Sequence, residues 1–114
     1  MGFENLSVWE RAKKLSVEIY RGTEKIRDFG FRDQVTRSGL SVPSNIAEGF
    51  ERESVKECIQ FLSYAKGSCG ELRTQILIGV EAGFLPEEKA SRWVKETVDI
   101  GAMLRGLINS KRRS

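Results

Sequence analysis

"SGLSVPSNIAEGFER", residues 38–52, places a proline in the middle of a segment that otherwise has a helical pattern. Pro43 has no backbone N–H to donate, and its ring presses on the carbonyl of Gly39, which in a helix interior costs about 3 kcal/mol. Apolar residues such as Val35 and Ile46 nevertheless stay on one face across the proline. We therefore predict a helix that is kinked at Pro43 and continues beyond it.

This second helix is predicted to run from Phe31 to Glu48, with the following glycine as its C-terminal stop. Five residues form its structural motif: Arg37, Pro43, Asn45, Glu48 and Gly49. Asn45 and Glu48 are expected to fasten the helix end to the turn and to the next helix, with Arg37 or Arg52 as partners of Glu48. A structural joint is the favoured interpretation, and a ligand or RNA site in the same segment is the alternative.

Capping signals and apolar periodicity predict helices on both sides of this segment. Ser7 and Glu10 have capping-box spacing and open a first helix, whose pattern breaks at Gly30. Ser54 and Glu57 repeat that spacing at the start of a long third helix. Amphipathic periodicity then supports both helices along their length.

The third helix is predicted to reach about Ala82 and to stop at Gly83. Pro86 suits the first position of a fourth helix, which is expected to fray over residues 109–114. Four amphipathic helices with short connections place neighbours antiparallel. The sequence therefore predicts an all-α, antiparallel, up-down-up-down four-helix bundle in a single domain, residues 1–114.

Positive charge is concentrated at the C-terminal end of the chain. The 114 residues carry a formal net charge of +3, which permits an anionic partner without demanding one. Residues 100–114 hold four basic side chains and no acidic one: Arg105, Lys111, Arg112 and Arg113. These are the candidate nucleic-acid-binding residues, which would contact phosphates. The alternative is a solvated helix end that complements the helix dipole.

The amino-acid composition does not favour an enzyme. The chain has no histidine, which removes the usual general base at neutral pH and the usual transition-metal ligand. The two glycines of "GSCGE" (residues 67–71) lie inside a helical pattern, so they do not form the strand-to-helix turn of a phosphate-binding loop. We predict a protein without catalytic residues, metal or cofactor.

Two cysteines and the absence of a targeting pattern point to the cytoplasm. Cys58 and Cys69 on one helix lie roughly 16 Å apart along its axis, beyond the roughly 7 Å that a disulfide allows. We expect both to be reduced and to face the core. No signal-peptide pattern follows Met1, and no apolar run approaches the roughly 20 residues of a membrane span.

The start of the third helix is more apolar than one core requires. Seven of the eleven residues from Val55 to Ala65 are apolar, whereas a core-facing helix needs about three in seven. The surplus surface should meet another chain or remain an exposed patch. We predict a homo-oligomer with Phe61 or Tyr64 near the subunit contact.

Three segments carry a resemblance to a known family: "RDQVTRSGLSVPSNIAEGFER" (residues 32–52), "FENLSVWERAKKL" (3–15) and "FLSYAKGSCGELRTQI" (61–76). Together they closely resemble the 23S rRNA intervening-sequence proteins, also called the four-helix-bundle protein family. The resemblance implies a left-handed bundle, usually assembled as a ring-like homo-oligomer, with a pentamer expected. A related bundle is an accessory subunit of a retroelement reverse transcriptase and contacts nucleic acid. The family has no established enzymatic activity.

Two hypotheses of function follow. The first is an RNA-binding accessory protein that uses phosphate contacts, because recognisable aromatic platforms for single-stranded RNA are missing. A ring of five chains would carry a formal charge of about +15, at +3 per chain, and would gather weak basic patches into one field. The second is an oligomeric scaffold for another protein, suggested by the third helix and by exposed-looking Leu40 and Phe50.

Overall fold

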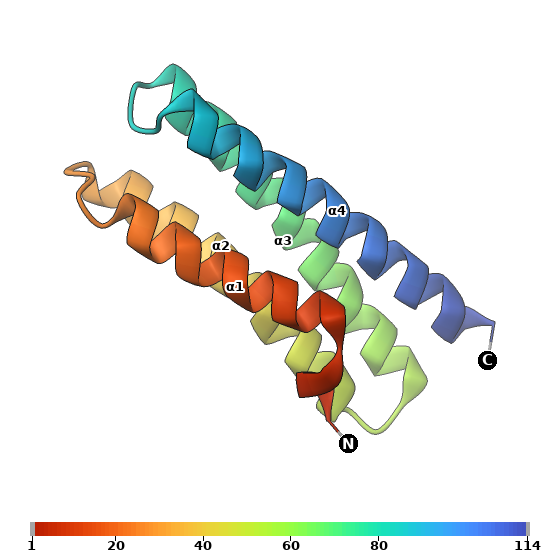
Figure 1. Ribbon diagram of the computed structural model, residues 1–114. Helices are drawn as coiled ribbons and strands as arrows, with labels where there is room; N and C mark the ends of the chain where they lie inside the picture. The colour runs from red at the N-terminus through yellow and green to blue at the C-terminus, as the bar shows by residue number, and fades with distance from the viewer. Residues whose placement is uncertain (1, 114) are drawn as a thin grey trace.

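Four long helices lie side by side in the computed structural model of the protein, which describes residues 2–113 (Figure 1). A 3-10 turn, Phe3–Asn5, precedes them. The helices are α1 (Ser7–Thr23), α2 (Phe29–Glu51), α3 (Val55–Glu81) and α4 (Glu87–Arg112). Over the described residues no strand occurs. The predicted all-α class with four packed helices is therefore confirmed.

Contacts across the α1–α4 pair show how the helices are arranged. Arg11 bonds to Glu96, and Glu18 bonds to Trp93, so residue numbers rise along α1 as they fall along α4. The α1–α2 and α3–α4 turns lie at one end of the molecule, and the two chain termini lie at the other end with the α2–α3 turn (Figure 1). The left hand of the bundle and the bend at Pro43 stay predictions.

All four helices contribute to one apolar core. Its largest fully buried members include Ile19, Val42, Ile46, Leu62, Leu72, Ile76, Ile100 and Leu104. Two threonines are buried among them with their hydroxyls satisfied. Thr23 donates to the carbonyl of Ile19 at 2.7 Å, and Thr97 donates to the carbonyl of Val94 at 2.6 Å. Both cysteines are buried and free, so their predicted core-facing position is confirmed.

The capping predictions have different outcomes at the two sites. Ser54 caps α3 as expected, because its hydroxyl accepts from the N–H of Glu57 at 3.1 Å. Ser7 does not cap α1 and is instead its first helical residue, with Leu6 as the N-cap. The N–H of Leu6 bonds to the carbonyl of Phe3 at 2.9 Å. This 3-10 turn sets the entry of the chain, so the serine side chain is not needed as a cap.

The second helix is longer than predicted at both ends. It starts at Phe29, because Asp28 is the N-cap and accepts from the N–H of Phe31 at 2.9 Å. It runs through Pro43 without terminating and ends at Glu51. Gly49 is therefore not a stop, and the prediction that the helix ends before it is wrong.

Gly49 is buried because two helices approach each other closely there. A Cβ at this position would lie 3.1 Å from the carbonyl oxygen of Cys58 and 3.2 Å from the Cβ of Phe61. The glycine serves contact between α2 and α3 rather than a left-handed cap. A glycine near the end of a helical pattern can mark a helix stop or a close contact between helices, and only the tertiary packing distinguishes the two.

The boundaries of α3 and α4 follow the turn chemistry between them. Gly83 has the positive φ, 83°, that favours glycine, and the N–H of Phe84 bonds to the carbonyl of Gly79 at 2.8 Å. The predicted stop is thus confirmed. Pro86 is the N-cap of α4 rather than its first helical residue. The predicted fraying from residue 109 is wrong, because α4 continues to Arg112; residue 114 lies outside the described residues.

Candidate functional site

Side-chain hydrogen bonds around Pro43 act within α2 and between α2 and α3. Asn45 donates its side-chain amide to the carbonyl of Ser41 at 2.8 Å, one turn earlier on the same helix. Ser41 in turn donates to the hydroxyl of Ser68 on α3 at 2.5 Å. The first bond spans Pro43 within α2, and the second joins the residues before the proline to α3.

Glu48 takes Arg52 as its partner, with nitrogen and oxygen 2.7 Å apart. The same guanidinium lies 4.8 Å from the ring centroid of Phe61, so it links the end of α2 to α3. Arg37, the other expected partner, is exposed and has no ion pair among residues 2–113. Glu48 therefore takes part in contacts at the end of α2, whereas Arg37, near the middle of that helix, forms no ion pair in residues 2–113.

The C-terminal cations lie on the last turns of α4. Arg105, Arg112 and Arg113 are exposed, and Lys111 lies 5.0 Å from the ring centroid of Phe50. That contact places this basic end beside the end of α2 (Figure 1). Four acidic residues occupy the same region, at the end of α2 and the start of α3: Glu48, Glu51, Glu53 and Glu57. The basic residues of α4 thus lie at the same end of the bundle as these acidic residues, which are more than forty positions away in the sequence.

Apolar surface remains on α3, as the composition of its first turns predicts. Tyr64 is 50% exposed and meets the ring of Phe61 edge-on, with centroids 5.4 Å apart. Large apolar side chains exposed elsewhere on this helix are Val55, Leu77 and Ile78. Between α3 and α4 a groove of about 470 Å³ has Leu77 and Val94 in its lining. Apolar side chains of α3 are thus exposed outside the bundle core at several points along the helix.

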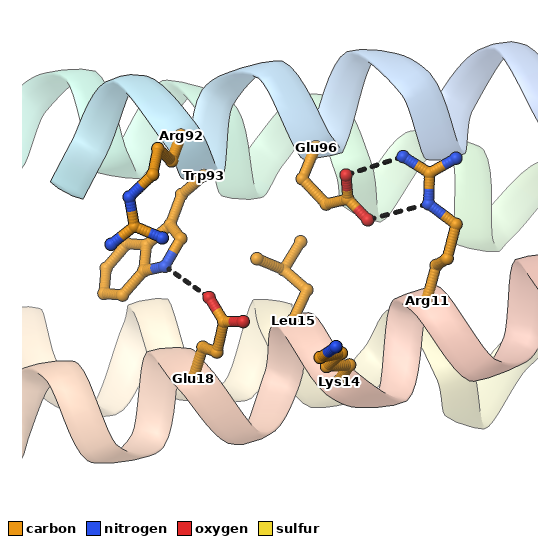
Figure 2. A pocket seen from close by; sticks show the side chains of 7 residues that line it. All are labelled: Arg11, Lys14, Leu15, Glu18, Arg92, Trp93 and Glu96. Atoms are coloured by element: carbon orange, nitrogen blue, oxygen red, sulfur yellow. Dashed lines mark hydrogen bonds and ion pairs between the residues drawn. The ribbon is translucent and has the colours of Figure 1, made fainter. Parts of the chain in front are cut away.

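A polar groove between α1 and α4 was not predicted from the sequence (Figure 2). Its central part, about 240 Å³, is lined by Arg11, Lys14, Leu15, Glu18, Arg92, Trp93 and Glu96. A second part of about 350 Å³ shares three of these residues and adds Arg21, Gly22 and Lys89. We call these two parts together the α1–α4 groove. Its residues are spread over positions 11–96, so only the tertiary structure brings them together.

Arg11 closes one end of this groove with an ion pair across the two helices. Its guanidinium binds both carboxylate oxygens of Glu96, at 2.8 and 2.6 Å, as Figure 2 shows, and reaches Asp99 at 3.3 Å. The hydrogen bond from Arg11 lowers the pKa of Glu96 below its ordinary range. Asp99 also has a lowered pKa, with the hydrogen bond from Lys95 as the largest cause. These charges are thus satisfied within the protein.

Trp93 forms the floor of the groove and is almost fully buried. Its indole N–H donates to Glu18 at 3.3 Å, which joins α4 to α1 a second time (Figure 2). Lys89 lies 5.8 Å from the indole centroid. In Figure 2 the side chain of Arg92 extends from α4 beside the indole toward α1. Polar groups therefore border an apolar floor along this face.

Neither a metal cluster nor a membrane span was found in the described part of the chain. No three side chains of His, Cys, Asp or Glu lie together in a way that suits a metal ion. None of the helices combines the length and hydrophobicity needed to cross a bilayer.

Comparison with known proteins places the chain in a family. The sequence pattern of the 23S rRNA-intervening sequence proteins matches residues 4–106. The chain belongs to that family. No curated protein matches the sequence significantly.

A solved structure supports the fold that the family implies. It is described as a protein with unknown function from the S23 ribosomal protein family of Bacteroides thetaiotaomicron VPI-5482. The two structures align with a TM-score of 0.83 at 21% sequence identity, over 89% of this chain and 97% of the other. At that identity the similarity establishes the fold alone.

Proposed function

We propose that this 23S rRNA-intervening sequence protein is a non-enzymatic, cytoplasmic accessory protein that binds RNA through backbone phosphates. The observation that carries the proposal is that several exposed Lys and Arg side chains form no ion pair within the described part of the chain. Among residues 2–113, six exposed cations on α1 and α4 form no ion pair: Lys14, Arg21, Arg92, Arg105, Arg112 and Arg113. Unpaired guanidinium groups are the usual donors to phosphate oxygens.

The protein acts as a homo-oligomer in this proposal, with a ring of five chains as the expected form. Support comes from Tyr64, which is half exposed beside Phe61 on α3. An aromatic pair of this kind is typical of protein interfaces. A ring repeats the cations once per chain, so weak phosphate contacts add up and affinity becomes steeply dependent on salt.

The test measures binding of a generic RNA at low and high salt together with the mass of the particle. We expect binding at about 50 mM salt that weakens strongly by about 200 mM, with little preference for sequence. Light scattering at micromolar protein should find an oligomer, and Tyr64→Ala should shift it toward the monomer. An intact oligomer that binds no RNA at the lower salt would remove the nucleic-acid role.

A protein-binding scaffold is the second candidate, and the apolar groove between α3 and α4 favours it. Leu77 and Val98 are each 49% exposed along this pair of helices. In that case the co-purified partner is a protein, and the substitution Leu77→Lys abolishes its capture while RNA affinity stays unchanged.

A further inference from the structure

We propose that the α1–α4 groove is a phosphate-binding site for the backbone of single-stranded RNA, with Glu18 as a built-in counter-charge that limits its affinity. The inference rests on the proposed RNA-binding function and assigns it to a surface other than the basic C-terminal end. It starts from the charges that line the groove. Five are cationic, Arg11, Lys14, Arg21, Lys89 and Arg92, and two are acidic, Glu18 and Glu96.

The ion pair of Arg11 with Glu96 cancels within the protein. Four cations then face one carboxylate, that of Glu18. Lys14, Arg21 and Arg92 are exposed and have no ion pair anywhere in residues 2–113. An excess of positive charge in a depression with an apolar floor raises the local concentration of anions, because the low-dielectric wall focuses the field.

The dimensions of the groove suit one strand of nucleic acid. Lys14 and Arg21 are seven residues apart on α1, which is roughly 10 Å along the helix. At the rise of about 3.4 Å per nucleotide of one strand in a duplex, that length covers about three phosphates. The cations line both sides, since Lys89 and Arg92 belong to α4. A shallow depression with cations on both sides can contact the phosphates of a flexible single strand, whereas a duplex presents a rigid convex surface to it.

The C-terminal end is less favourable for the same task. Its cations share one end of the bundle with three carboxylates that form no ion pair in residues 2–113, those of Glu51, Glu53 and Glu57. Glu48 is paired there with Arg52, and Lys56 adds one cation. Lys111 is engaged with the ring of Phe50. Acidic neighbours repel a phosphate that approaches these cations, whereas the groove has a single uncompensated carboxylate.

The charge of Glu18 gives a specific test, because removal of this carboxylate should increase the affinity of the groove for RNA. One oxygen of Glu18 accepts from the indole N–H of Trp93, a role that a glutamine oxygen also fills. Glu18→Gln therefore keeps the link between the helices and removes one negative charge from the groove. A damaged fold would not produce tighter binding, so this variant separates a site from a structural effect.

The experiment compares four variants by fluorescence anisotropy with labelled single-stranded oligouridine and a duplex of equal length. The groove variant is K14Q/R21Q/K89Q/R92Q, and its control, R105Q/K111Q/R112Q/R113Q, removes the same charge from the C-terminal end. E18Q is matched by E71Q, which removes an exposed carboxylate from α3. Light scattering and thermal melts accompany each variant, so that assembly and folding are known.

With about three phosphates neutralised at about 0.7 each, the wild-type slope of log affinity against log salt for a single strand is about −2 from the groove alone. We expect the groove variant to lose about tenfold or more in affinity at about 50 mM salt and most of that slope. The control should change the slope by less than about 1 unit, and E18Q should bind about two- to fivefold more tightly than E71Q.

Three results would overturn the inference. If the wild type binds RNA and the groove variant binds equally well, the groove is not the site while the RNA-binding function stands. If E18Q gains nothing over E71Q, the carboxylate does not face the phosphates. If polyglutamate binds with the same dependence on these residues and oligouridine does not, the occupant is an acidic protein. A wild type that binds no RNA at low salt removes the proposed function itself.

Discussion

The indole of Trp93 on α4 lies directly over Gly22 of α1, where a side chain of any size would collide with it. A Cβ on Gly22 would be 2.7 Å from two ring carbons of the tryptophan. The close approach lets a large aromatic side chain become almost fully buried at the edge of the bundle. It also brings Lys89 of α4 near α1, so the contact shapes the far part of the α1–α4 groove.

We predict that Gly22→Ala destabilises the protein by about 1–3 kcal/mol, despite the better helix propensity of alanine, because the ring has to move. Gly67→Ala is the matched control, since nothing lies within 4 Å of a Cβ there. That substitution in the middle of α3 should stabilise by about 0.5–1 kcal/mol. Urea unfolding measures both. Equal effects at the two positions would show that packing at Trp93 is not tight.

Gly49→Ala should destabilise by about 1–3 kcal/mol for a related reason. Its added Cβ would meet the backbone oxygen of Cys58 and the Cβ of Phe61, and a backbone atom cannot rotate away. If Gly49 were only a helix stop, alanine would cost little at a position with helical φ. The free energy of unfolding, measured beside Gly67→Ala, decides between these two roles.

The ion pair of Arg11 with Glu96 predicts a defined pH dependence. Because the pKa of Glu96 is lowered in the folded state, its contribution is present above the ordinary value of 4.5 and is lost as the pH falls through the lowered value. We expect Glu96→Gln to cost about 0.5–1 kcal/mol near pH 7, a modest amount because the pair is partly exposed. The difference from wild type should vanish in acid. Urea unfolding at several pH values tests this, and a constant difference would contradict it.

Pro43→Ala should leave the protein folded and change the free energy of unfolding by less than about 2 kcal/mol, because the lost constraint is offset by a restored N–H. Circular dichroism and light scattering give helix content and mass. If assembly depends on a bend, the oligomer weakens while the chain stays helical. Complete unfolding of the variant would contradict the prediction.

Both cysteines should be slow to react with thiol reagents in the native protein. Desolvation raises the pKa of Cys69 to about 11, and burial likewise raises that of Cys58, so neither is a thiolate at neutral pH. Labelling with a maleimide should be slow in buffer and fast in urea. Rapid labelling of both without unfolding would mean that the core opens at α3.

The fold was largely predictable because its signals are local. Capping at Ser54, the left-handed Gly83 and the apolar stripes are properties of a few adjacent residues. The errors arose where tertiary contacts change the meaning of a local signal. Gly49 resembles a stop but serves helix contact, and Ser7 has the spacing of a cap but follows a 3-10 turn that replaces it.

The candidate site was harder to predict for the same reason. The C-terminal cations stand out as a cluster in sequence, yet the fold sets acidic residues at the same end of the bundle. The groove, in contrast, joins Lys14 and Arg21 to Lys89 and Arg92 across more than sixty residues of sequence. The spacing of Lys14 and Arg21 by seven residues places both on one side of α1, but it does not identify the opposing helix.

The order of helix contacts has a consequence for how the chain folds. Extensive packing joins sequence neighbours, α1 with α2, α2 with α3 and α3 with α4. Among these four helices, as described over residues 2–113, the sparse α1–α4 contact alone joins distant segments. Chains dominated by such local contacts fold within microseconds to milliseconds. We expect the α1–α4 contact to form after the transition state. Gly22→Ala should then accelerate unfolding and leave the folding rate unchanged, whereas Gly49→Ala, between adjacent helices, should slow folding.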